Sequence, residues 1–185
     1  PALEVGAETR VEMGMSVGVD AACRSGDQAR FSLEGIYQGL GGSLALSASS
    51  SFIVGVLAMK QFEAANIGLA IPDNGPAVEF SMPIDGSGIV SDIGITVNIT
   101  HTYISDLVVE LVHPSGVSAI VHNNDGGSSQ NLSATYGMNG TPNAELKKLF
   151  GLPSQGQWKL RVKDTAGADT GSVDSVKLVL KGFLE

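Results

Sequence analysis

Short segments in which apolar and polar residues alternate recur about every ten residues through the C-terminal two thirds of the chain. The clearest spans residues 89–100, where Ile93, Ile95, Val97 and Ile99 fall on one face of an extended chain. A spacing of two residues is the period of a half-buried strand. Many short strands at this interval predict an all-β sandwich whose apolar faces bury one another.

The stretch from residue 99 to residue 116 organises this pattern. An apolar strand end is followed by the polar corner Ser105-Asp106, a second strand over 107–112 and a Pro-Ser-Gly turn at 114–116. The remaining expected elements are strands over 78–82, 117–122, 158–162 and 172–182, and one or two helical turns over 144–150.

Residues 1–65 have weaker strand patterns. Alternation over 9–19, 29–36 and 44–55 predicts three or four strands, which make a thin core for an independent sandwich. We interpret this region as a partial β-sandwich module whose first strands lie upstream, or as a sheet that packs on its neighbour. A further hypothesis is that its edge strands pair with another copy of the chain.

A sharp turn separates the two regions. Residues 71–76, Ile-Pro-Asp-Asn-Gly-Pro, contain two prolines and an Asn-Gly pair, which exclude a central strand. We expect residues 56–70 to connect two domains, with a boundary near residue 65 and a second domain over 66–183. The closing residues 184–185 resemble a cloning remnant and are left out of the expected fold.

Composition and charge limit the function classes. A hydrophobic content of 43% supplies a core, and a net charge of −8 disfavours nucleic acid as a partner because like charges repel. No run approaches the roughly 18 apolar residues of a transmembrane helix, so we expect no membrane span. Cys23 is the only cysteine, which excludes an internal disulfide framework.

The histidines do not suggest catalysis. The chain has three, and it contains neither a Gly-x-Ser-x-Gly element nor a His-Glu-x-x-His motif. We expect His101 to form local hydrogen bonds, His113 to belong to a turn, and His122 to lie at the surface beside the 123–125 loop. The chain therefore does not carry an active site of its own.

Calcium is the cofactor that the acidic residues favour. Calcium prefers carboxylate and loop carbonyl oxygens, and the candidate ligands are Asp73, Asp106, Asp164 and Asp169. Asp106 and Asp164 form the best pair because both lie at expected strand ends. Since none of them has EF-hand spacing, the alternative is that they stabilise turns.

Binding of a polymeric substrate is a second possibility for an all-β domain. Sugar sites often present exposed aromatic rings. Trp158 has the phase of a core residue, which leaves Tyr37, Tyr103 and Tyr136 as candidates.

Several motifs, in order, resemble the P-domain (P/Homo B domain) that follows the catalytic domain of kexin- and furin-like proprotein convertases and of many secreted bacterial serine and metalloproteases. The motifs are Ile71-Pro72-Asp73-Asn74, residues 97–103, Ser105-Asp106-Leu107, residues 111–116, residues 156–160 and residues 164–171. Residues 10–55 resemble, more loosely, a β-sandwich module that precedes such domains. One departure lies at 135–139, where bacterial P-domains often have an acidic pair and this chain has Thr-Tyr-Gly-Met-Asn.

The resemblance implies a jelly roll of the galactose-binding type. It implies an extracellular, bacterial, non-catalytic accessory domain that packs on the catalytic domain of a parent endopeptidase, assists its folding, and tunes its stability and its response to calcium or pH. The alternative is a targeting module that binds a polysaccharide or an insoluble protein.

Overall fold

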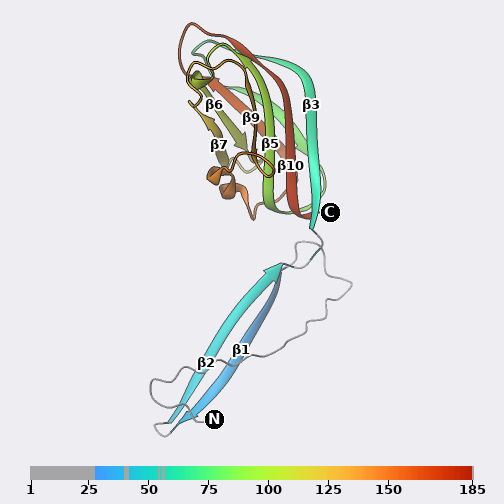
Figure 1. The fold of residues 1–185 in the computed structure, drawn as a ribbon. Helices are drawn as coiled ribbons and strands as arrows, with labels where there is room; N and C mark the ends of the chain where they lie inside the picture. The colour runs from blue at the N-terminus through green and yellow to red at the C-terminus, as the bar shows by residue number, and fades with distance from the viewer. Residues whose placement is uncertain (1–27, 40–41, 54, 56, 185) are drawn as a thin grey trace.

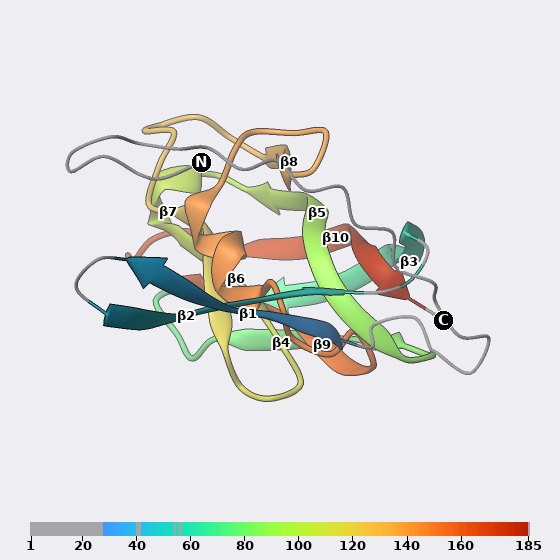
Figure 2. The same ribbon diagram turned by 90° about the horizontal axis from the view of Figure 1, so that it is seen from below.

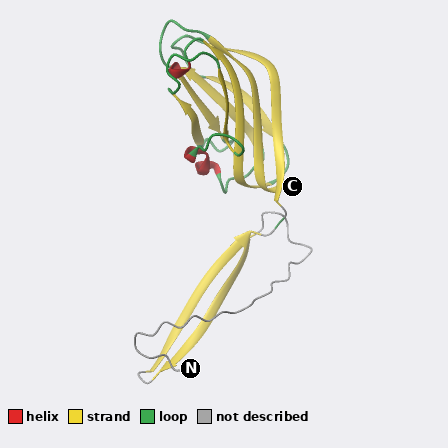
Figure 3. Ribbon diagram, viewed as in Figure 1, coloured by secondary structure: helices red, strands yellow, loops and turns green. Residues whose placement is uncertain are grey.

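The computed structural model describes residues 28–39, 42–53, 55 and 57–184. Nearly all regular structure in this part of the chain is β-strand, as Figure 3 shows. The elements are β1 (Gln28–Gly39), β2 (Gly42–Ile53), β3 (Leu57–Ile71), β4 (Val78–Ile84), β5 (Gly88–His101), η1 (Ile104–Asp106), β6 (Leu107–Val112), β7 (Ser118–Asn123), β8 (Leu132–Gly137), η2 (Ala144–Leu149), β9 (Gly156–Asp164) and β10 (Gly171–Leu184).

Strands β3 to β10 form two four-stranded antiparallel sheets, ordered β3-β10-β5-β8 and β4-β9-β6-β7 (Figures 1 and 2). Successive strands mostly alternate between the sheets, so that the chain wraps around a common core. Eight strands in this order are a jelly roll. The prediction of an all-β sandwich is confirmed.

The core consists of the facing sides of the two sheets. The predicted inward residues of β5, from Ile93 to Ile99 at a spacing of two, are at most 1% exposed. Trp158 of β9 is fully buried, and its indole N–H donates a hydrogen bond to the carbonyl of Ser154 (2.8 Å). Burial removes apolar area from water, and it stabilises the fold by roughly 1.5–3 kcal/mol for each large aliphatic side chain.

Strand β3 contradicts the expected connection over 56–70. It pairs with β10 over residues 57–65 and again over residues 69–71, from Leu57 opposite Phe183 to Ile71 opposite Gly171. It also continues without interruption across residue 65. The division of the chain into two domains at that position stays a prediction, but the jelly roll includes residues on both sides of it.

A β-bulge explains why the alternation in β3 is hard to detect. Side chains at even positions from Ala58 to Ala64 point toward the core, whereas Ile67, Leu69 and Ile71 at odd positions do so after the bulge. The register shifts between Ala65, opposite Ser175, and Leu69, opposite Val173, and the side-chain phase of β3 reverses across this irregular step. Before the bulge, Met59 is 67% exposed while Lys60 is half-buried, which obscures the pattern further.

Two smaller corrections concern β8 and Leu184. Strand β8 was not expected, and it forms the edge beside β5, with Tyr136 opposite Ile95. Leu184, which was left out of the expected fold, pairs with Gly88 and is only 6% exposed. It therefore takes part in the sandwich whatever its origin. The helical turns expected over 144–150 are confirmed as η2.

In the N-terminal region the structure describes one hairpin, β1–β2, which lies apart from the sandwich in Figure 1. Its strands match the expected segments 29–36 and 44–55. The expected strand over 9–19 and Cys23 lie outside the described residues, so the partial sandwich module stays a prediction.

The course of β3 predicts where the jelly roll can be cut. A fragment of residues 57–184 should unfold cooperatively at the temperature of the sandwich in the whole chain. A fragment of 66–184 should fail to fold, because it loses the residues that pair with Ser175–Phe183 of β10 and the packing of Phe62. Circular dichroism melting curves measure both outcomes; equal stability of the two fragments would contradict the prediction.

Candidate functional site

Antiparallel pairing of β6 and β9 brings the predicted acidic residues to one end of the sandwich. Asp106 is the last residue of η1, immediately before β6, and Asp164 is the last residue of β9. Leu107 lies opposite Asp164 in this pairing. Asp169 follows in the loop from β9 to β10, close enough to Asp106 for its negative charge to raise the pKa of that carboxyl.

Asp164 is the buried anchor of this end. It is 1% exposed, and its Oδ1 accepts a hydrogen bond from the backbone N–H of Ala166 (3.0 Å). Its Oδ2 lies 3.4 Å from Nε2 of His101, which is also 1% exposed. Both carboxylate oxygens therefore already have partners within the protein.

Asp73 and Asp169 hold the 165–170 loop. Oδ2 of Asp73 accepts a hydrogen bond from the backbone N–H of Ala168 (3.1 Å), and Asp169 accepts one from the hydroxyl of Thr102. Ala168 has a φ of 87°, a left-handed conformation that is costly for alanine. The turn at 72–75 thus fixes the loop that carries Asp169.

Asn124 braces the same end from the 123–129 loop. Its side-chain amide donates to the carbonyl of Ser105 (2.7 Å) and to the hydroxyl of Thr165 (2.9 Å). Asn124 has a φ of 52°, and asparagine tolerates this conformation better than most residues do. The sequence pattern predicted no structural role for this loop.

Crowding of carboxylates affects the ionisation of Asp106. Burial raises the pKa of Asp106, and the negative charges of Asp164 and Asp169 raise it further, while His101 opposes them. Two like charges held close together disfavour each other's ionised form. The site is therefore an accumulation of negative charge.

These residues supply the oxygen atoms that calcium prefers, but most of their carboxylates already accept hydrogen bonds from other groups of the protein. Among the described residues, no group of three His, Cys, Asp or Glu side chains is positioned to hold a metal ion. The carboxylates of Asp164, Asp169 and Asp73 all accept hydrogen bonds from the surrounding loops. The structure brings Asp106, Asp164 and Asp169 together and places Asp73 against the same loop, and their role as metal ligands stays a prediction.

The three histidines hold loops in place. Nδ1 of His101 lies 3.0 Å from the carbonyl oxygen of Tyr103, which confirms its expected local hydrogen bonding. In the 114–116 turn, Nδ1 of His113 accepts a bond from the backbone N–H of Ser115 (2.9 Å), and its Nε2 donates to the carbonyl of Pro153 (2.8 Å).

His122 was wrongly expected at the surface. It is 6% exposed, its Nε2 donates to the carbonyl of Ile104 (2.9 Å), and its Nδ1 lies 3.1 Å from the hydroxyl of Tyr136. Burial raises the pKa of Tyr136, and the charge of Asp125 adds to this effect, so the hydroxyl keeps its proton and donates a hydrogen bond to Nδ1 of His122.

Burial reduces the number of aromatic residues that could form a sugar site. Trp158 is buried, as predicted, and Tyr136 is 9% exposed, whereas Tyr103 is 39% exposed. The side chain of Tyr37 lies outside the described part of the structure.

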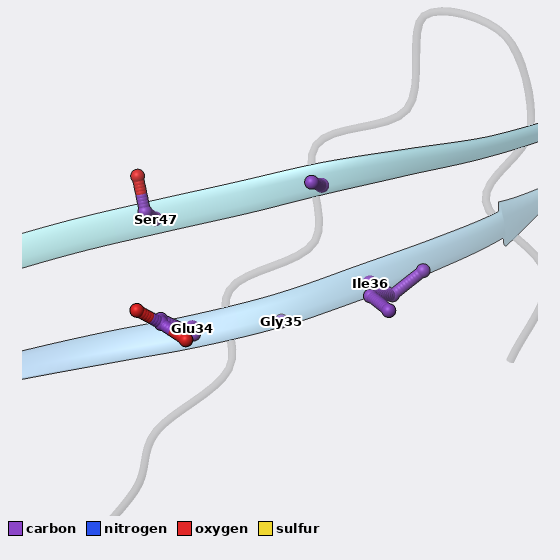
Figure 4. A pocket seen from close by; sticks show the side chains of 5 residues that line it. Glu34, Gly35, Ile36 and Ser47 are labelled. Carbon is purple, nitrogen blue, oxygen red and sulfur yellow. The ribbon is translucent and has the colours of Figure 1, made fainter.

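A hollow of about 700 Å³ lies along the hairpin, lined by Glu34, Gly35, Ile36, Ala45 and Ser47 (Figure 4). It is an open surface along two strands rather than an enclosed site. Among the described residues of this lining, Glu34 alone has an ionisable side chain, and the hollow lies on a different element from the carboxylates. We therefore do not consider it a candidate metal site.

In the described part of the chain, no helix has the length and apolar character needed to cross a membrane.

Comparison with known proteins identifies the family. Residues 90–180 match the family model of the proprotein convertase P-domain. This part of the chain is a P-domain. The matched residues run from β5 to β10 and include Asp106, Asp164 and Asp169. The resemblance inferred from the motifs is confirmed.

The relatives include a bacterial enzyme and a bacterial protease. The chain is 42% identical over 112 residues to leupeptin-inactivating enzyme 1 of Streptomyces exfoliatus, covering 58% of this chain and 23% of that protein. It is 42% identical over 108 residues to a calcium-dependent protease of Trichormus variabilis, covering 57% of this chain and 16% of that protein. This chain thus spans less than a quarter of the length of either relative.

A solved structure shares the fold. The serine protease of Aeromonas sobria matches with a TM-score of 0.54 and 16% identity, covering 80% of this chain and 36% of the protease. At this identity the match supports the fold of the P-domain and nothing more specific.

Asp164 should contribute more to stability than an exposed acidic residue does. Asp164→Ala removes the acceptor for the Ala166 N–H and the partner of His101 in a buried site, and should lower the free energy of unfolding by about 1–3 kcal/mol. The exposed control Asp85→Ala should change it by less than about 0.5 kcal/mol. Urea denaturation measures both values, and similar losses in the two variants would contradict the anchoring role.

Proposed function

We propose that the P-domain is a non-catalytic accessory domain of an exported bacterial endopeptidase, and that it stabilises the catalytic domain of that enzyme or assists its folding. The observation that carries this proposal is the match of 108–112 residues to a minor part of each of two bacterial enzymes, one of them named as a protease. In both relatives the remaining length is more than three quarters of the protein, which leaves ample room for a separate catalytic domain.

The internal chemistry of the P-domain supports the same proposal. All three histidines are buried and use their ring nitrogens to hold loops, as Asp164 does with its carboxylate oxygens. Buried side chains that use their polar atoms for hydrogen bonds within the domain stabilise its fold. A domain with such a fold can stabilise a partner through a buried interface, because binding to the folded state of the partner lowers its free energy.

Removal of the P-domain tests the proposal in the complete protease. Deletion of residues 57–184 should abolish secreted activity, since the catalytic domain would lose the surface that stabilises it. The measurement is the activity and the amount of protease in the culture medium. As a control, Gln157→Lys changes an exposed residue of β9 and should leave both unchanged. Full activity after the deletion would contradict the accessory role.

We also propose that calcium binds at the acidic end, with Asp106 and Asp169 as ligands and Asp164 and Asp73 as the residues that hold the surrounding loops. The support is the proximity of carboxylates that raise the pKa of Asp106, together with a relative named as a calcium-dependent protease. A bound cation would neutralise the repulsion among these charges.

Asp106→Asn tests the calcium site and the repulsion together. Because the folded-state pKa of Asp106 is raised, its contribution to stability is greatest in acid and is lost as the pH rises through that pKa. Without calcium, the asparagine variant should therefore melt at a higher temperature than the wild type at pH 7, and the difference should shrink in acid.

Calcium gives the second arm of this experiment. At about 100 times its Kd, it should stabilise the wild type by about 2.7 kcal/mol and the variant much less. Asp85→Asn is the matched control, because it removes one exposed carboxylate in the turn between β4 and β5. If calcium raises the melting temperature of Asp106→Asn as much as that of the wild type, the proposed ligand is wrong.

A further inference from the structure

The outer face of the β3-β10-β5-β8 sheet carries rows of small polar side chains. In one row, the hydroxyls of Thr96 and Thr135 are 2.8 Å apart. In the next, the amide of Asn98 donates to the hydroxyl of Ser175 (2.7 Å), and Ser133 donates to the amide oxygen of Asn98 (2.7 Å).

A third row continues toward the acidic end. There the hydroxyl of Thr100 donates to Asp174 Oδ2 (2.7 Å), and the hydroxyl of Ser172 donates to Asp174 Oδ1 (2.7 Å). These side chains come from three neighbouring strands, β8, β5 and β10. All of them are partly or fully accessible to solvent.

A shallow hollow of about 150 Å³ crosses this face toward β3. Its polar lining consists of Thr96, Asn98, Ser175, Lys177 and Glu63. The charges of Lys177 and Glu63 compensate each other at 3.2 Å. The hollow is too small to enclose a drug-sized ligand, for which pockets of roughly 300–1,000 Å³ are usual, but it is open to a polymer lying across the sheet.

The rows are pre-organised for further hydrogen bonds. A Ser or Thr hydroxyl has one donor and two acceptor sites, so a hydroxyl that makes one bond keeps capacity for a ligand. The cross-strand bonds also restrict the side-chain rotamers before any ligand binds, which reduces the entropy lost on binding. Neighbouring strands repeat the polar groups at intervals of about 4.8 Å.

Charge and composition select the partner. The Asn98 row carries no charged side chain, and the Thr96 row continues into Lys177 and Glu63, whose charges compensate each other. On a chain of net charge −8, a neutral polymer therefore meets no net opposing charge at these rows, whereas an anionic polymer is repelled by the remaining surface. Protein interfaces favour aromatic residues and are depleted in serine. A surface of Ser, Thr and Asn therefore matches the hydroxyl groups of a polysaccharide better than a protein surface.

We propose that the outer face of the β3-β10-β5-β8 sheet binds a neutral polysaccharide through the rows centred on Thr96 and Asn98. The sequence had suggested polymer binding only through aromatic rings, whereas the structure provides a hydroxyl and amide surface instead. This binding adds to the proposed accessory role and does not depend on it, since the deletion experiment measures the catalytic domain and not retention on a polymer.

Retention of the whole 185-residue chain on insoluble cellulose and chitin tests the proposal, with pectate as an anionic polysaccharide and collagen as a protein polymer. Asn98→Ala removes the central amide and should weaken retention on cellulose or chitin about fivefold. Ser133→Lys places a long charged side chain over the same row and should weaken it at least as much. The matched control Gln157→Lys adds the same charge to the outer face of the other sheet and should be retained like the wild type.

An NMR titration of the wild type with soluble cello- and chito-oligosaccharides locates the site. This experiment needs no variant, so its result does not depend on whether a variant folds. The expected amide chemical shift changes are concentrated at Thr96, Asn98, Ser133 and Ser175. Failure of the wild type to bind either neutral polymer would overturn the proposal, as would preferential retention on collagen or pectate. Shift changes confined to other elements, or equal losses in Gln157→Lys, would also overturn it.

Discussion

The pairing of β10 with both β3 and β5 is the constraint on which the jelly roll depends. β10 is the last strand of the chain, yet it lies inside its sheet and supplies backbone hydrogen bonds to neighbours on each side. Until β10 is in place, β3 has no partner in the sheet and the inner residues of β5 are uncovered on one side. Contacts this far apart in sequence make loop closure costly, so the sandwich should fold slowly for its size.

The acidic end is a consequence of the same topology. Antiparallel neighbours place the start of β6 beside the end of β9, so Asp106 and Asp164 meet although 57 residues separate them. Hydrogen bonds between polar groups connect the surrounding loops. Asn124 bonds to Ser105 and Thr165, Asp73 bonds to Ala168, and His122 bonds to Ile104. The concentrated negative charge is tolerated because rigid hydrogen bonds keep it in place.

The strict alternation of apolar and polar residues made much of this fold predictable. Ile93 to Ile99 and the core phase of Trp158 follow directly from a period of two, and the ordered motifs identified the family. The bulge in β3 was not predictable in the same way, because it reverses the phase midway and because Lys60 and Met59 lie on the faces opposite to those expected from their polarity. The acidic residues of the candidate site could be named from strand ends. Their bonds with His101, Thr102 and Ala168 depend on distances between loops that no local pattern encodes.

The first and last strands of the P-domain end side by side, with Leu57 opposite Phe183. A force applied through both ends would therefore pull β3 and β10 apart at their shared end. Antiparallel backbone hydrogen bonds lie perpendicular to the strands, so they would break one after another, as in a zipper, and not all at once in shear. The domain should consequently be mechanically weak when it is stretched between two attached segments, even where it is thermally stable.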